Sequence, residues 1–294
     1  MIKTTPFEMV FIIRDGMKKL LCIGLVLGLL FSLVACDKWH TPTIPTDMTT
    51  HYPPVTEEPT TLPPVTEEAT TAPTTLPPEP TEPEHSEFYI PGVSTEDIIT
   101  YFNEVVLSME YTTGDGDVTL VQKWKRPIRY RIEGTPTEED MAVLQALFAQ
   151  LNAIEGFPGL EEAQQTPPED LTISFWDMES FNLAFSDVLH GELADGAVQF
   201  WYYTDTNEIH TGRIGYRTDI SQQIRNSVIL EEIINCLGFN DTVMREDSIV
   251  YQYSSDNTQL SPIDRVLLRL LYHPDIQCGM NAQQCRAVLE KLYY

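Results

Sequence analysis

The chain has 294 residues, of which 44 are Asp or Glu and only 18 are Lys or Arg, so its formal net charge at pH 7 is −26. This excess of acidic residues argues against nucleic acids and anionic lipid surfaces as electrostatic partners. Hydrophobic residues make up 42% of the chain, which is enough for a buried core over part of its length.

Residues 17–36 have the pattern of a bacterial lipoprotein signal. Two lysines follow Met17, an apolar run too short for a permanent membrane span comes next, and the segment ends in Leu-Val-Ala-Cys36. We therefore expect a signal peptide over residues 1–36, with Met17 as the true start and Cys36 as the lipidated residue. The mature chain would be anchored to a cell membrane and face outside the cytoplasm, on the extracellular side or in a periplasm.

Residues 37–87 consist mainly of Thr, Pro and Glu and contain the near-repeat PPVTEEPTTL and PPVTEEATTA. A segment with so few apolar residues cannot offset the entropy cost of folding, and its prolines favour extended conformations. We predict a disordered linker, followed by one globular domain at residues 88–294.

The first half of this domain alternates between helix and strand signals. Ser94 with Asp97, and Thr137 with Asp140, form capping-box patterns that each predict the start of a helix. Alternating apolar residues predict strands at 118–124, 128–132, 171–176, 181–185, 198–204 and 209–216. This order predicts an α+β domain with a twisted mixed sheet backed by helices.

Apolar residues then surround nearly the whole second half of a helix predicted over 220–237, which is typical of a helix buried in a core. Gly238 suits a left-handed helix end. Residues 230–242 read LEEIINCLGFNDT.

This segment resembles the H-E-x-x-H-x-x-G-x-x-H/D helix of metzincin zinc proteases. The corresponding residues here are Glu231, Glu232, Asn235, Gly238 and Asp241. Zinc prefers nitrogen and thiolate ligands, and both histidines are replaced, so zinc is not expected as a cofactor.

Two later segments extend the resemblance. Residues 247–251 (DSIVY) stand at the methionine turn, with Val250 at the methionine position, and residues 260–272 (LSPIDRVLLRLLY) are similar to the segment that follows it in matrix-type metzincins. The same segments are also similar to a bacterial lipoprotein domain family of unknown function. The metzincin resemblance implies a zincin-like fold, and the resemblance to the family of unknown function implies that the missing histidines are a family trait and implies no activity.

We therefore expect an anchored, non-catalytic module that binds a peptide, a protein or a cell-wall component. The alternative is a divergent metal-dependent hydrolase, in which Glu231, Asn235 and Asp241 hold calcium or magnesium through oxygen ligands and Glu232 acts as the base. A purely structural envelope protein is the third hypothesis.

The remaining reactive residues suggest no further site. Cys278 and Cys285 are close in sequence and compatible with a local disulfide outside the cytosol, whereas Cys236 is expected to be an inert core residue. The domain's histidines lack the spacing of metal ligands. Five aromatic residues fit either a binding groove or the sheet core, the latter being favoured: Trp124, Trp176, Trp201, Tyr202 and Tyr203.

Overall fold

The computed structural model describes residues 7–13, 85–108, 119–164, 170–189, 191 and 193–294, the first range by its backbone alone. These residues belong to one compact unit. The hydrophobic core that the structure describes lies between Phe88 and Tyr293. The predicted lipidation site Cys36 and the predicted linker up to residue 84 lie outside the described residues.

A mixed sheet forms the centre of the fold. Its strand order is β1-β6-β7-β5-β3-β4, and β2 also pairs with β7. The strands β2, β3, β4, β5 and β7 pair in parallel, whereas β6 pairs antiparallel with β7 and with β1. The strands are β1 Phe7–Ile13, β2 Lys123–Trp124, β3 Ile128–Gly134, β4 Leu160–Glu162, β5 Leu171–Trp176, β6 Gly196–Tyr203 and β7 Glu208–Arg217.

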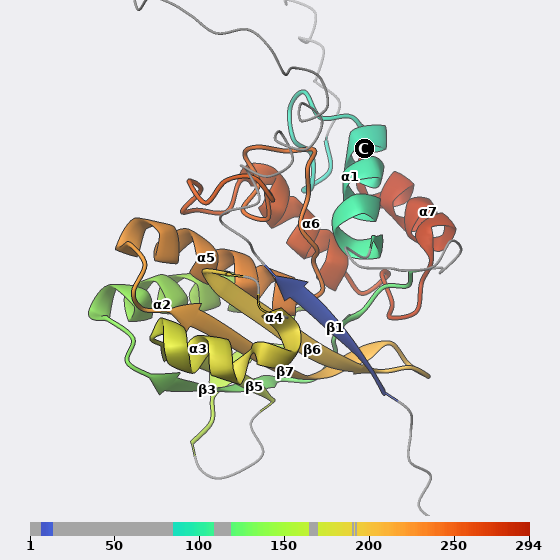
Figure 1. The fold of residues 1–294 in the computed structure, drawn as a ribbon. Helices are drawn as coiled ribbons and strands as arrows, with labels where there is room; N and C mark the ends of the chain where they lie inside the picture. Colours follow the sequence, from blue (N-terminus) through green and yellow to red (C-terminus); the bar gives the residue numbers. More distant parts are fainter. Residues whose placement is uncertain (1–6, 14–84, 109–118, 165–169, 190, 192) are drawn as a thin grey trace, which may run out of the picture. The chain divides into compact units, whose positions relative to one another are not determined.

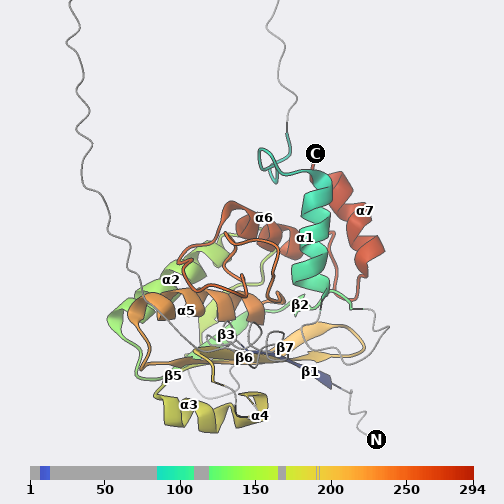
Figure 2. The same cartoon turned by 45° about the horizontal axis from the view of Figure 1, so that its top comes forward.

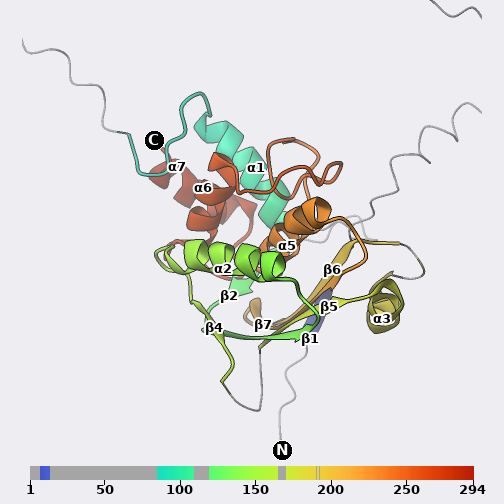
Figure 3. The ribbon, with the colours of Figure 1, turned by 90° about the vertical axis from the view of Figure 1, so that its left-hand side faces the viewer.

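Helices lie on both faces of this sheet (Figures 1 and 2). α2 and α5 pack against each other on one face, and the short α3 and α4 lie on the other. α1 packs against α6 and α7 (Figure 3). The helices are α1 Thr95–Leu107, α2 Glu138–Asn152, α3 Met178–Ala184, α4 Ser186–Leu189, α5 Gln222–Cys236, α6 Pro262–Tyr272 and α7 Ala282–Leu292. The predicted mixed sheet backed by helices is confirmed.

Local sequence explains where the longer helices begin. Ser94 and Thr137 are the N-caps of α1 and α2, and each forms a complete capping box with the predicted aspartate. Ser261 caps α6 in the same way, with Pro262 in its first turn.

The strand predicted at residues 181–185 is wrong, because this segment lies in α3 and its C-cap. Asp177 caps the helix by accepting a hydrogen bond from the Ser180 backbone N–H. Phe181 and Phe185, four residues apart, are buried on one helical face, whereas Leu183 is 77% exposed. Three alternating apolar residues fit a strand, but the cap and the burial pattern favour a helix.

Two other strands differ from the prediction. Of the strand predicted at 118–124, the structure describes residues 119–124 and forms only the two-residue β2. β1 lies before the expected start at Met17, where no strand is predicted.

Candidate functional site

The zincin-like segment lies on the buried half of α5. Every residue from 227 to 236 is buried, as the sequence predicts for a core helix. Glu231 and Glu232 are both 0% exposed and Asn235 is 1% exposed. The carboxylates are therefore closed to solvent.

Glu232 faces the sheet at the start of β6. A β-carbon on Gly196 would lie 2.9 Å from Oε1 of Glu232 and 2.4 Å from a methyl group of Val228, so only glycine lets α5 approach this closely. Burial raises the pKa of Tyr216 and of the Cys236 thiol, and the nearby Glu232 carboxylate raises both further by a smaller amount. The prediction of Cys236 as a buried core residue is confirmed.

Asn235 connects the helix to the segment that follows it. Its Nδ2 donates a hydrogen bond of 3.0 Å to Oδ1 of Asp241. The hydroxyl of Thr242 then donates to the Glu104 carboxylate of α1 over 2.8 Å, and Asn240 donates to the carbonyl of Val105 through both its backbone and its side chain. These bonds tie the end of α5 to α1.

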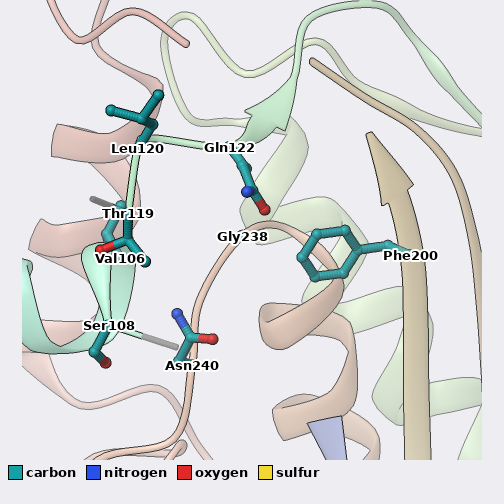
Figure 4. A pocket seen from close by; sticks show the side chains of 8 residues that line it. All are labelled: Val106, Ser108, Thr119, Leu120, Gln122, Phe200, Gly238 and Asn240. Atoms are coloured by element: carbon teal, nitrogen blue, oxygen red, sulfur yellow. The ribbon is translucent and has the colours of Figure 1, made fainter. Parts of the chain in front are cut away.

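Gly238 ends this helix as predicted. Its φ of +107° is in the left-handed region. A small cavity of about 20 Å³ lies beside it, roughly large enough for one water molecule. Gln122, Asn240 and Phe200 point into it (Figure 4).

Asp264 holds the turn at residues 247–251. Its carboxylate accepts hydrogen bonds from the Ser248 hydroxyl at 2.6 Å and from the Ile249 backbone N–H at 3.0 Å, and it also caps α6. Burial raises the pKa of Asp264. Val250, at the methionine position, is fully buried. The carboxylate of Asp264 therefore joins the turn at 247–251 to the start of the helix within 260–272.

The structure brings together only part of the alternative metal site. Asn235 and Asp241 are hydrogen-bonded to each other. In the described part of the chain, no group of three or more His, Cys, Asp or Glu side chains is placed to hold a metal ion. Glu231, Glu232 and Asn235 line neither the cavity beside Gly238 nor the two hollows between α2 and α6. Of helix α5, Leu230 lines one of those hollows.

A second buried cluster, not predicted from the sequence, surrounds Lys123. The Lys123 ammonium donates one hydrogen bond of 2.7 Å to the carbonyl of Leu271, in the last turn of α6. It donates a second, of 2.5 Å, to the carbonyl of Ile276, which follows this helix. Burial lowers the pKa of Lys123 to about 8. Cys278 donates to the Lys123 carbonyl at 3.6 Å. Cys278 and Cys285 are free thiols in the structure, and their disulfide stays a prediction.

The five aromatic residues divide between the two environments considered. Trp124 and Tyr202 are buried in the core, whereas Trp176, Trp201 and Tyr203 are partly exposed. Tyr203 stacks on His210 with ring centroids 4.2 Å apart. The described residues therefore do not gather the five aromatics into one groove.

Strand β6 provides a different surface, which the sequence analysis missed. β1 pairs with it over seven consecutive residues, from Phe7 opposite Tyr203 to Ile13 opposite Ala197. The sequence FEMVFII, rich in aromatic and β-branched residues, is a strand signal that could have revealed β1.

The pairing of β6 with β7 shows which backbone N–H and C=O groups of β6 face β1. The backbone N–H of Arg217 in β7 donates to the carbonyl of Asp195 at 3.1 Å. Backbone groups alternate between the two sides of an antiparallel strand, so those of Val198 and Phe200 face β1. β6 can therefore bind an extended segment through its main chain.

Residues 95–291 match the family described as "protein of unknown function (DUF2927)". The chain belongs to this family. The DUF2927 domain thus comprises α1 to α7, all of the sheet except β1, and the segment resembling a zincin helix. The expected membership of a family of unknown function is confirmed. No curated protein matches the chain.

Within the described residues of this DUF2927 protein, no helix is both long and apolar enough to cross a membrane.

Proposed function

We propose that this chain is a lipid-anchored, extracytoplasmic binding module whose zincin-like domain takes up an extended peptide along the edge of β6. The carrying observation is the antiparallel pairing of β1 with β6 over seven residues. Extended peptides commonly bind by adding a strand to an exposed sheet edge, where main-chain hydrogen bonds supply much of the affinity.

The predicted processing makes this edge available. With Met17 as the start and cleavage before Cys36, the mature chain lacks β1, which leaves Val198 and Phe200 with backbone groups facing solvent. An unpaired edge of this length is a template for another strand. The proposed occupant is an extended, apolar peptide segment similar in character to FEMVFII.

The zincin-like part of the proposal is supported by element order and by the motifs. The chain runs through β3, α2, β4 and β5, then through the short helices α3 and α4, and then through β6 and β7 before reaching the buried helix α5 with its glycine end. The burial of Glu231 and Glu232 supports a structural role for these residues and counts against the hydrolase alternative.

Anchoring is tested by expressing the full chain in bacteria fed an alkyne-labelled fatty acid. We expect label on the wild-type chain and none on Cys36→Ser. Label that persists in Cys36→Ser, or its absence from the wild type, would contradict the anchoring part of the proposal.

Peptide binding is tested separately with residues 37–294 and a synthetic peptide of residues 5–15. We expect saturable one-to-one binding by calorimetry. A peptide with Val10→Pro should bind at least about tenfold more weakly, because proline removes a donor that faces β6. Failure of the unmodified peptide to bind would overturn the proposed site without affecting the anchor.

A further inference from the structure

A groove between α2 and α6 forms a second candidate binding site. Two hollows, of about 400 and 310 Å³, share the lining residues Gln150, Leu260 and Arg265 and therefore adjoin. We call this combined space the α2–α6 groove. It shares no lining residue with β6, so it is independent of the proposed peptide site.

The floor of the α2–α6 groove is apolar. Leu147 and Leu151 of α2 and Leu268 of α6 are fully buried beneath it, and Leu230 of α5 is 5% exposed. Hydrophobic hollows of several hundred cubic ångströms with a few polar side chains are typical of small-molecule sites. The groove therefore suits a ligand with an extended apolar part.

Arg265 supplies the one unpaired guanidinium of the described residues. Every other arginine in the described ranges forms an ion pair with Asp or Glu. Arg265 lines both hollows and is exposed, and its side chain has no hydrogen bond or ion pair with another described residue. In a chain with 44 acidic residues, this free cation marks the groove for an anion.

We propose that the α2–α6 groove binds an anionic amphiphile of the long-chain fatty acid class. Its carboxylate pairs with the guanidinium of Arg265, and its apolar chain lies over Leu147 and Leu230. Arg265 suits this role because a planar guanidinium binds a carboxylate through two parallel hydrogen bonds.

The test titrates oleate, below its micelle concentration, into residues 37–294, which contain the whole described core. We expect one saturable site, with binding weakened about tenfold in Arg265→Gln. Lys125→Gln, which removes an exposed cation outside the groove, should bind like wild type. Ala146→Phe, on the exposed rim, should block binding by filling the groove.

Oleyl alcohol separates the contribution of the head group from that of the tail. It should bind wild type and Arg265→Gln with equal, weaker affinity, and all variants should retain the wild-type melting temperature. The proposal is overturned by absence of oleate binding, by equal binding in Arg265→Gln and wild type, or by equal weakening in Lys125→Gln.

Discussion

At the scale of single residues, Gly238 is the position where the fold requires a glycine at the end of α5. A β-carbon at this position would lie 2.2 Å from the carbonyl oxygen of Gln122, and its backbone is left-handed. The glycine is therefore required by the fold of the helix end, whatever the neighbouring side chains do.

Replacing Gly238 by alanine should destabilise the domain by more than about 2 kcal/mol, because strain at positive φ is added to a main-chain clash. Gly92 is the matched control, since its φ is +81° and a β-carbon there would have no neighbour within 4 Å. Gly92→Ala should cost about 1 kcal/mol. Urea unfolding measures both; equal costs would contradict the packing argument.

Lys123 should make stability depend on pH. Its pKa is about 8 in the fold and 10.5 when unperturbed, so between these values the unfolded chain binds more protons. The contribution of Lys123 to the free energy of unfolding should therefore rise by about 3 kcal/mol from pH 8 to pH 10.5, and this rise should be absent below pH 8. It is measured as the difference between the wild type and Lys123→Met, because the raised pKa values of Cys236 and Tyr216 act in the opposite direction in both.

The test for Lys123 compares unfolding curves across this pH window. Lys123→Met should lack the rise, whereas Lys125→Met, which alters an exposed lysine, should retain it. Parallel pH profiles for the wild type and Lys123→Met would show that the buried amine is not responsible.

Part of the candidate site could be read from single residues. The end of α5 at Gly238 and the buried Cys236 follow from the sequence, because local conformation and apolar surroundings determine them. The hydrogen bonds of Lys123 to residues about 150 positions away could not be predicted, because they depend on how distant segments pack.

At the scale of elements, a buried ion pair joins α5 to α2. Arg225 donates to Asp140 at 2.7 Å, and their side chains are 5% and 0% exposed. Asp140 is also part of the capping box of α2, so one carboxylate fixes both the start of that helix and its contact with α5.

Arg225→Met should destabilise the domain by about 3–5 kcal/mol, because it leaves the Asp140 carboxylate buried without its cation. Arg126→Met breaks an exposed pair with Glu208 and should cost less than about 1 kcal/mol. Thermal and urea unfolding measure the two variants. Similar losses in both would contradict the distinction between buried and exposed pairs.

Prediction of elements was most successful where a helix carries its own start signal. The capping boxes of α1 and α2 predict their first turns correctly. α3 was misread because three apolar residues over five positions fit both periodicities, and β4 was missed because three residues are too few to establish a pattern. Sheet order depends on long-range pairing and could not be deduced.

At the scale of the whole molecule, the proposed anchor, peptide site and amphiphile site lie on three different parts of the chain. The proposed anchor is Cys36, the proposed peptide site is the β6 edge, and the proposed amphiphile site is the α2–α6 groove. The carboxylates of Glu231 and Glu232 in α5 are buried in the core and line none of these surfaces. The family resemblance thus informs the fold, and the proposed binding functions depend on other residues.

The central claim, main-chain recognition at β6, is tested most directly with two singly N-methylated peptides of residues 5–15. The register places Val10 opposite Phe200, whose backbone groups face β1, and Phe11 opposite Gln199, whose backbone groups face β7. Calorimetry with residues 37–294 should show strong loss of binding for N-methyl-Val10 and near-normal binding for N-methyl-Phe11. Equal affinity of the two peptides would contradict the proposed pairing.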